Sequence, residues 1–142
     1  MAFVVSKYMD RTFSTVDIDS TVRAAARRIA EGGTGFALVL EQGVPAGVIS
    51  AVEIVSSVVA GALDSGTVKV RDVMVPLVSV DPDDDVIKAS EVMQERKRGL
   101  LAVMRDGIVY GVVMAQGVAE HSPELIDLAV RDIIRWGFPW KP

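Results

Sequence analysis

The chain has 142 residues, half of them hydrophobic, and a formal net charge of −4. This length suits one compact fold, the composition argues against disorder, and the acidic balance argues against a nucleic-acid surface. The sequence has no cysteine and a single histidine, His121. These counts exclude disulfides and thiolate chemistry and disfavour a His-rich metal site or a Ser-His-Asp triad. We therefore predict no catalytic residues and no metal ligands.

The amino-terminal segment does not resemble a secretory signal, because charged residues follow Val5 too soon for a hydrophobic region. The longest apolar stretch, residues 44–63, carries Glu53 near its middle, where a carboxylate would be costly in lipid. We interpret this stretch as a strand followed by a helix and expect a soluble, cytoplasmic protein. The absence of both cysteine and asparagine is in keeping with a thermophilic source.

Residues 16–48 align without gaps with residues 80–112, at a constant offset of 64 positions. The identical pairs on this offset include Asp17/Asp81, Asp19/Asp83, Val22/Val86, Ala25/Ala89, Gly35/Gly99, Val39/Val103, Gly43/Gly107 and Gly47/Gly111. Chance rarely places glycines, acidic residues and apolar positions all in register, so the pattern indicates an internal duplication.

Each copy begins with a short extended piece, residues 15–17 and 77–80. An acidic helix start follows: Asp19-Ser20 in the first copy and residues 83–85 in the second should cap the helix N-terminus. Apolar residues then recur at helical spacing. We expect Gly32-Gly33 and Gly99 to end these two helices.

Two apolar strands joined by a tight turn come next in each copy, at residues 36–40 and 44–49 and at residues 100–104 and 108–113. Gln42-Gly43 and Asp106-Gly107 occupy the turns, and Asp-Gly favours a type I′ hairpin because both turn positions need positive φ. We predict a helix after Ser50, ending near Gly61, and then a polar linker. Each copy alone buries too little surface, so the copies should pack face to face.

The end of the last strand differs between the copies. The first copy reads Gly47-x-x-Ser50-x-x-Glu53, whereas the second has Met114 and Gly117 in the serine and glutamate positions. Taken alone, the Ser50–Glu53 spacing is also that of a helix N-cap followed by an acidic first turn. One copy has therefore kept polar groups that the other has lost.

A duplicated β-α-β-β-α unit with Gly-x-x-[Ser/Thr]-x-x-[Asp/Glu] after its last strand resembles a tandem pair of CBS domains. Residues 5–9 (Val-Ser-Lys-Tyr-Met) and 70–74 (Val-Arg-Asp-Val-Met) resemble that family's lead-in segments. The resemblance implies an α/β (α+β) fold with two repeats packed by pseudo-twofold symmetry. We place repeat 1 at 4–62, a linker at 63–69, repeat 2 at 70–121, and a C-terminal helix and aromatic tail at 122–142.

The resemblance also implies an adenine-nucleotide ligand, with AMP first and ADP or ATP as alternatives. Ser50 and Glu53 would hold the ribose; the usual family carboxylate is Asp, one methylene shorter than Glu53. The implied base pocket comprises Ile49, Asp72, Val73, Met74, Pro76, Gly99 and Leu100. Lys97 and Arg98 are the nearest basic candidates for the phosphate. Met114 and Gly117 lack the needed oxygens, so the second site should bind poorly or differently.

Other interpretations stay open at this point. The module could serve only structure or oligomerisation, with empty clefts, or bind S-adenosylmethionine; an enzyme is disfavoured because no nucleophile–base pair converges. Residues 95–98 also fit a solvated helix end, and residues 81–85 fit helix capping better than a cation site. The resemblance implies a homodimer and a protein partner of unknown identity. Trp136, Phe138 and Trp140 favour a subunit or partner interface over folding back on the chain.

Overall fold

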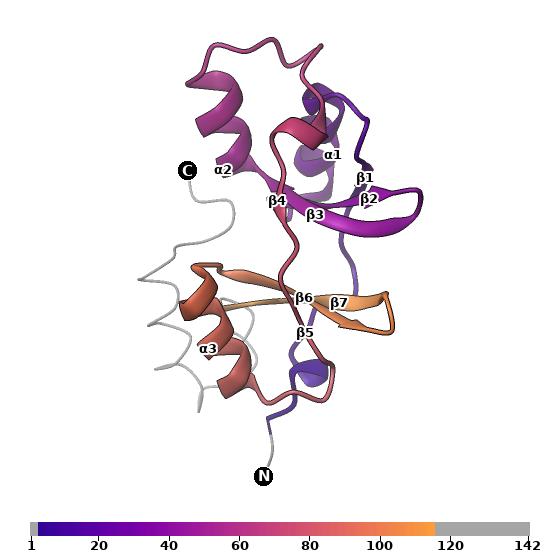
Figure 1. Cartoon of the computed structure of the whole chain (residues 1–142), viewed down its shortest axis with the longest axis vertical. Helices are drawn as coiled ribbons and strands as arrows, with labels where there is room; N and C mark the ends of the chain where they lie inside the picture. Colours follow the sequence, from indigo (N-terminus) through magenta and orange to yellow (C-terminus); the bar gives the residue numbers. More distant parts are fainter. Residues whose placement is uncertain (1–2, 116–142) are drawn as a thin grey trace. The chain divides into compact units, whose positions relative to one another are not determined.

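The structure is a computed structural model that describes residues 3–115 and contains two compact units, each a sheet with helices packed on it (Figure 1). The Ser50 unit comprises residues 13–77. The Met114 unit comprises residues 3–12 together with residues 78–115. The predicted C-terminal helix and the aromatic residues 136–140 lie outside the described residues. Within residues 3–115, no helix is long and apolar enough to cross a lipid bilayer.

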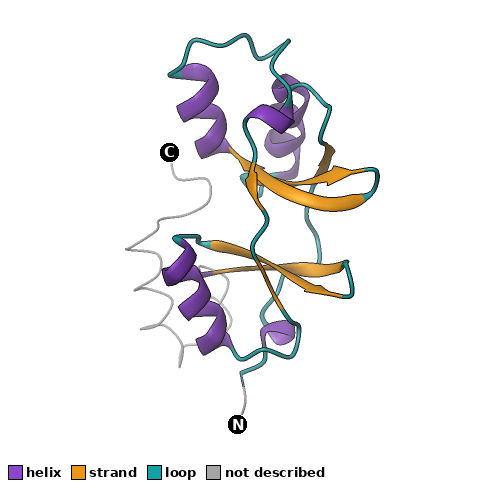
Figure 2. Ribbon diagram, viewed as in Figure 1, coloured by secondary structure: helices purple, strands orange, loops and turns teal. Residues whose placement is uncertain are grey.

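The Ser50 unit follows the predicted β-α-β-β-α order and adds one short strand. Its elements are β1 (Thr15–Asp17), α1 (Val22–Gly32), β2 (Phe36–Glu41), β3 (Val44–Ser50), α2 (Ala51–Glu53), the π-helical continuation η2 (Ile54–Val59), the 3-10 turn η3 (Val70–Asp72) and β4 (Val75–Pro76). The sheet order is β1-β2-β3-β4, with β1 parallel to β2 and the remaining pairs antiparallel. Figure 2 shows both helices on the same side of this sheet.

The Met114 unit repeats this plan. Its elements are η1 (Val5–Lys7), β5 (Ser79–Val80), α3 (Val86–Arg96), β6 (Leu100–Arg105) and β7 (Ile108–Met114). Strand β5 is parallel to β6, and β6 is antiparallel to β7. The pairing of the hairpin strands shifts between Val39 and Leu40 in one unit and between Val103 and Met104 in the other. The duplication therefore extends to the irregularities of the backbone, and the mixed α+β fold is confirmed.

Both hairpins turn where the sequence predicts. Gln42 and Gly43 have φ values of 52° and 79°, and Asp106 and Gly107 have φ values of 53° and 76°. Positive φ at both positions gives the loop a twist that matches the twist of the flanking strands. The helix predicted after Ser50 is also present, but its last six residues, Ile54–Val59, are π-helical, which the pattern did not indicate.

The predicted cap of the first helix is wrong by one to two residues. Thr21 is the N-cap of α1, and its Oγ1 accepts a hydrogen bond from Ala24 N at 3.2 Å. In α3, Asp85 is the N-cap and accepts a hydrogen bond from Ile87 N at 2.8 Å, as the acidic run indicated. Thr21 lies 64 residues before Asp85, so the duplication itself identifies the correct position.

The predicted end of the second helix is also wrong. Gly33 ends α1 in the left-handed conformation with φ of 72°, as expected. The C-cap of α3 is Lys97, two residues before Gly99, and Lys97 has φ of 58° and ψ of 46°. A side chain with a Cβ adopts this conformation at a cost that glycine avoids. The fold holds Lys97 where the other copy has a glycine.

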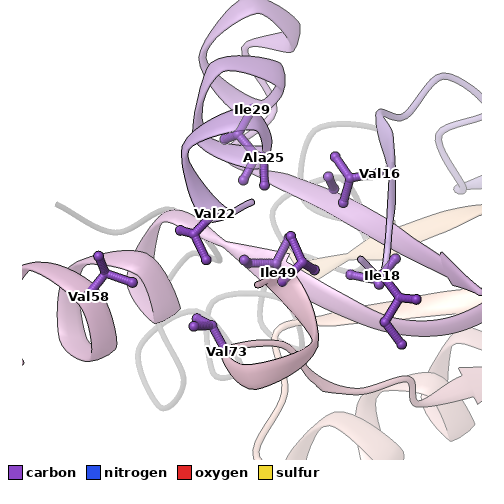
Figure 3. Packing of buried hydrophobic residues seen from close by; sticks show 11 residues of the cluster. Val16, Ile18, Val22, Ala25, Ile29, Ile49, Val58 and Val73 are labelled. Atoms are coloured by element: carbon purple, nitrogen blue, oxygen red, sulfur yellow. The ribbon is translucent and has the colours of Figure 1, made fainter. Parts of the chain in front are cut away.

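The core of the Ser50 unit lies between its helices and one face of its sheet. Figure 3 shows Val22, Ala25 and Ile29 of α1 pointing toward Ile49 of β3, with Val58 of η2 completing the cluster. Three of these side chains recur at helical spacing, which is why this sequence forms a helix with one buried face. Burial of each large aliphatic side chain stabilises the fold by about 1.5–3 kcal/mol.

The two lead-in segments, residues 5–9 and 70–74, are exchanged between the copies. Residues 70–74 complete the Ser50 unit, where Val70 N donates to Ser20 O at 2.9 Å. Residues 5–9 complete the Met114 unit, where Val5 N donates to Asp84 O at 2.8 Å. Val5 and Val70 are both fully buried. Each compact unit is therefore built from one copy's sheet and the other copy's lead-in segment.

Candidate functional site

The candidate site begins at the point where β3 ends and α2 starts. Ser50 is the N-cap of α2, and Ser50 with Glu53 forms a capping box. Glu53 Oε1 accepts hydrogen bonds from Ser50 N at 3.0 Å and from Ser50 Oγ at 2.8 Å. Ser50 is buried and Glu53 is half-buried. These two bonds fix the position and orientation of the carboxylate.

The neighbouring loop also contributes to this helix start. Ala51 N donates to Gly35 O at 3.0 Å, and Gly35 has φ of 83°. Because glycine tolerates positive φ, the loop can place this carbonyl beside the first turn of α2. The first amide of the helix is thereby satisfied within the unit.

The carboxylate of Glu53 keeps one oxygen for another partner. Its Oε1 takes both hydrogen bonds of the cap, and among residues 3–115 no donor lies within hydrogen-bonding distance of its Oε2. An ionised carboxylate only accepts hydrogen bonds, so it matches a group with neighbouring hydroxyl donors, such as a vicinal diol. The capping interpretation of Ser50 and Glu53 is correct, and it leaves capacity for a ligand.

Gly47 brings the second lead-in segment against β3. Gly47 pairs with Pro76, and Val48 pairs with Val75. A Cβ added at Gly47 would lie 2.6 Å from Val75 O and 3.0 Å from Met74 Sδ. Only glycine permits this approach, so the glycine of the Gly-x-x-Ser motif serves strand pairing.

The predicted base-contacting residues of the Ser50 unit fall into two groups. Ile49 is fully buried and Val73 is 6% exposed, and both belong to the hydrophobic core (Figure 3). Met74 is half-buried and packs against that core. Asp72 and Pro76 are exposed. The side chains of Ile49 and Val73 thus support the sheet, and the exposed neighbours are the ones available to a ligand.

The remaining predicted residues belong to the Met114 unit. Lys97 is exposed in its left-handed conformation, and Arg98 N donates to Met93 O at 2.9 Å. Gly99 O accepts a hydrogen bond from Ala115 N at 3.4 Å, and Leu100 begins β6. Their roles toward a phosphate and a base stay a prediction.

The counterpart of the site in the Met114 unit keeps the backbone and loses the polar groups. A Cβ added at Gly111 would lie 2.5 Å from Asp10 O and 3.0 Å from Met9 Sδ, which repeats the arrangement at Gly47. Met114 replaces the serine and is 9% exposed, within the apolar interior. Gly117, the counterpart of Glu53, lies outside the described residues.

Two arginine clusters near the lead-in segments were missed by sequence reasoning. In the Ser50 unit, Arg71 lies 3.0 Å from Asp19 and 3.3 Å from Glu41. The hydrogen bond to Asp19, and then its charge, raise the pKa of the Arg71 guanidinium above its ordinary value.

In the Met114 unit, Arg105 lies 2.6 Å from Asp81 and 2.6 Å from Asp83. The hydrogen bond from Arg105 lowers the pKa of the Asp81 carboxyl, with a further contribution from the backbone N–H of Asp83. The acidic run thus serves ion pairing and capping. No group of three or more acidic or histidine side chains within residues 3–115 is arranged to hold a metal ion.

Comparison with known proteins identifies the family to which this fold belongs. The CBS domain family model matches residues 5–60 and again residues 70–124. A conserved CBS domain protein of unknown function, TA0289 from Thermoplasma acidophilum, is 25% identical with a TM-score of 0.81, covering 97% of this chain and 80% of that chain. No curated protein sequence matches the chain.

Two further solved structures show the same fold at lower identity. The CBS domain protein PAE2072 from Pyrobaculum aerophilum, complexed with AMP, is 22% identical with a TM-score of 0.80, covering 90% of this chain and 99% of that chain. A hexameric CBS-CP12 protein from bloom-forming cyanobacteria is 19% identical with a TM-score of 0.81, covering 89% of this chain and 71% of that chain. With two matched repeats and this fold, the chain belongs to the CBS-domain family and is a tandem CBS module, a class of regulatory domain.

Proposed function

We propose that the module binds an adenine nucleotide, with AMP as the first candidate and ADP or ATP as alternatives, and that it has no catalytic activity of its own. The observation that carries this proposal is the geometry of Glu53. Its Oε1 is fixed by Ser50 and its Oε2 has no donor within the described residues. The two hydroxyls of a ribose would supply donors to such a carboxylate. The AMP complex of the Pyrobaculum protein supports the choice of ligand.

The second lead-in segment would supply the base contacts of the same site. In this segment, Asp72 is exposed and lies three residues before Val75. Val75 and Pro76 pair with Val48 and Gly47 of β3. Lys97 and Arg98 remain the proposed phosphate contacts, and Gly99 and Leu100 remain proposed base contacts. Binding would shift the module between conformations that a partner protein detects.

Isothermal titration calorimetry with AMP, ADP, ATP and S-adenosylmethionine tests this proposal. We expect binding of AMP by the full chain, and absence of binding of every ligand at millimolar concentration contradicts it. Glu53→Gln is the decisive variant, because glutamine also serves in a capping box but lacks the charge and the second acceptor oxygen. We expect AMP affinity to fall by about tenfold or more, as for a lost hydrogen bond to a charged group.

A matched control separates ligand binding from stability. Glu91 is an exposed glutamate on α3 and is not one of the residues proposed to contact the nucleotide, so Glu91→Gln removes the same charge without removing a proposed contact. We expect Glu91→Gln to bind AMP like the unchanged chain. Equal thermal midpoints for both variants would show that the loss at Glu53 concerns the ligand.

We also propose that the module self-associates, as a homodimer. The helix after Ser50 exposes Val55 and Val59, whose exposed fractions are 58% and 69%. Residues 54–63 contain no charged side chain, and a helix without a charged face is usually covered. The hexameric cyanobacterial relative supports association within this fold. Sedimentation of Val59→Lys, with Ile108→Lys as an exposed apolar control, tests it: only Val59→Lys should lower the mass in solution.

A further inference from the structure

Arg71 connects the second lead-in segment to two other parts of the Ser50 unit. Its guanidinium bonds Asp19, in the turn before α1, at 3.0 Å, and Glu41, the last residue of β2, at 3.3 Å. The Arg71 side chain is 49% exposed, so these ion pairs are accessible to solvent and to salt.

The Met114 unit holds its corresponding charges in another way. On the offset of 64 residues, Glu41 corresponds to Arg105, and the cation of that unit therefore sits on the hairpin. Arg105 bonds Asp81 and Asp83, which lie in the same stretch of chain as β5 and the start of α3. Within residues 3–115, this cluster makes no ion pair with the first lead-in segment.

The residue of the first lead-in segment that matches Arg71 is Ser6. The backbone identifies the pair: Arg71 N donates to Ile18 O at 3.0 Å, and Ser6 N donates to Pro82 O at 3.1 Å. Both lead-in segments therefore have the same main-chain attachment. Only the second one carries an added charged attachment.

This added attachment lies immediately before the proposed base contacts. Asp72 follows Arg71 directly, and Met74 lies against the position of Gly47. A segment that moves at Arg71 would therefore also move the residues that face the ligand. The unit with the polar Ser50–Glu53 pair is the unit with the charged attachment, and the unit with Met114 is not.

We infer that Arg71 is a positioning residue, whose ion pairs with Asp19 and Glu41 hold residues 70–76 where they can contact a nucleotide. This inference rests on the proposed function for its effect on ligand binding. Its effect on the order of the segment needs no ligand, so the two can be tested apart.

Hydrogen exchange of the ligand-free full chain gives the first test. Met74 N and Val73 N both donate to Val70 O, so their exchange reports the order of the segment. We expect Arg71→Gln to raise exchange at these amides about two- to fivefold, the factor that corresponds to an exposed ion pair. Arg105→Gln is the matched control and should leave them unchanged. Equal exchange in Arg71→Gln and the unchanged chain would overturn the inference.

A charge transposition gives the second test. The double variant Arg71→Ser with Glu41→Arg gives the Ser50 unit the charge layout of the Met114 unit, with the cation on the hairpin. We expect calorimetry to show an AMP affinity about two- to fivefold weaker, at an unchanged thermal midpoint. The single variant Arg71→Lys keeps a cation on the segment, and it should keep most of the AMP affinity of the unchanged chain.

The outcomes distinguish this inference from the proposed function. If the unchanged chain binds no nucleotide, the proposed function fails, and hydrogen exchange alone decides the role of Arg71. If the unchanged chain binds AMP and the transposed variant binds it equally well, the positioning role is refuted and the proposed function stands.

Discussion

In the Ser50 unit, the third strand ends in a buried serine whose hydroxyl bonds a carboxylate; in the Met114 unit, the same strand ends in a methionine within an apolar interior. The backbones around these two positions agree closely, down to the methionine and carbonyl that pack on Gly47 and on Gly111. This difference shows that the fold does not depend on the polar pair. The pair is a chemical addition to a scaffold that is complete without it.

Substitution of the two glycines gives the sharpest separation of scaffold from site. We expect Gly47→Ala and Gly111→Ala each to lower the free energy of unfolding by up to about 3 kcal/mol, because the added methyl meets a backbone carbonyl that cannot move aside. Denaturant unfolding measures both. Only Gly47→Ala should also weaken AMP binding, and equal weakening by both variants would break the comparison.

Truncation of the buried lead-in valines tests whether the exchanged segments are equivalent. Val5 and Val70 are both fully buried, so Val5→Ala and Val70→Ala should each cost roughly 2 kcal/mol of unfolding free energy. Hydrogen exchange should locate the loss in the Met114 unit for Val5→Ala and in the Ser50 unit for Val70→Ala. A loss in the opposite unit would contradict the exchange of segments.

Substitutions at the C-caps of the two helices should change the stability by smaller amounts and in opposite directions. Gly33 and Lys97 occupy the same left-handed position, at φ of 72° and 58°. We expect Gly33→Ala to destabilise the chain by about 1 kcal/mol and Lys97→Gly to stabilise it by about 0.5–1 kcal/mol. Thermal unfolding of the two variants measures both signs. A destabilising Lys97→Gly would show that the lysine side chain makes a compensating contact.

The smallest expected effect concerns how the stability of the fold depends on pH in the acidic range. Arg105 lowers the pKa of Asp81 in the folded state, so the pair stabilises the fold above the unfolded pKa of about 3.9. That contribution is lost as the pH falls below this value toward the lowered folded pKa. We expect Arg105→Gln to reduce the slope of stability against pH below about pH 4. Unfolding midpoints from pH 5 to pH 2 check this, and an unchanged slope would refute it.

The duplication predicted most of the fold because it doubled every local signal. Asp106-Gly107 identified one hairpin directly, and its counterpart Gln42-Gly43 followed at the same offset. The residue types of each copy, taken separately, do not indicate the helix caps at Thr21 and Lys97. A threonine and a lysine are weaker local signals than aspartate and glycine, and only the alignment of the copies reveals them.

The candidate site was predictable in part for a different reason. Ser50 and Glu53 are near neighbours in sequence, so their hydrogen bonds follow from the local helix start. The ion pair of Arg71 with Asp19 spans 52 residues and depends on which unit the lead-in segment completes. Spacing carries no information about such long-range contacts. The burial of Ile49 and Val73 likewise follows from the tertiary packing.

The exchange of the lead-in segments has a consequence for how the gene could be divided. A break at residues 63–69, between the sequence repeats, would leave each fragment with the lead-in segment that completes the other fragment's sheet. Neither fragment could complete its fold alone. Co-expressed halves should instead rescue one another.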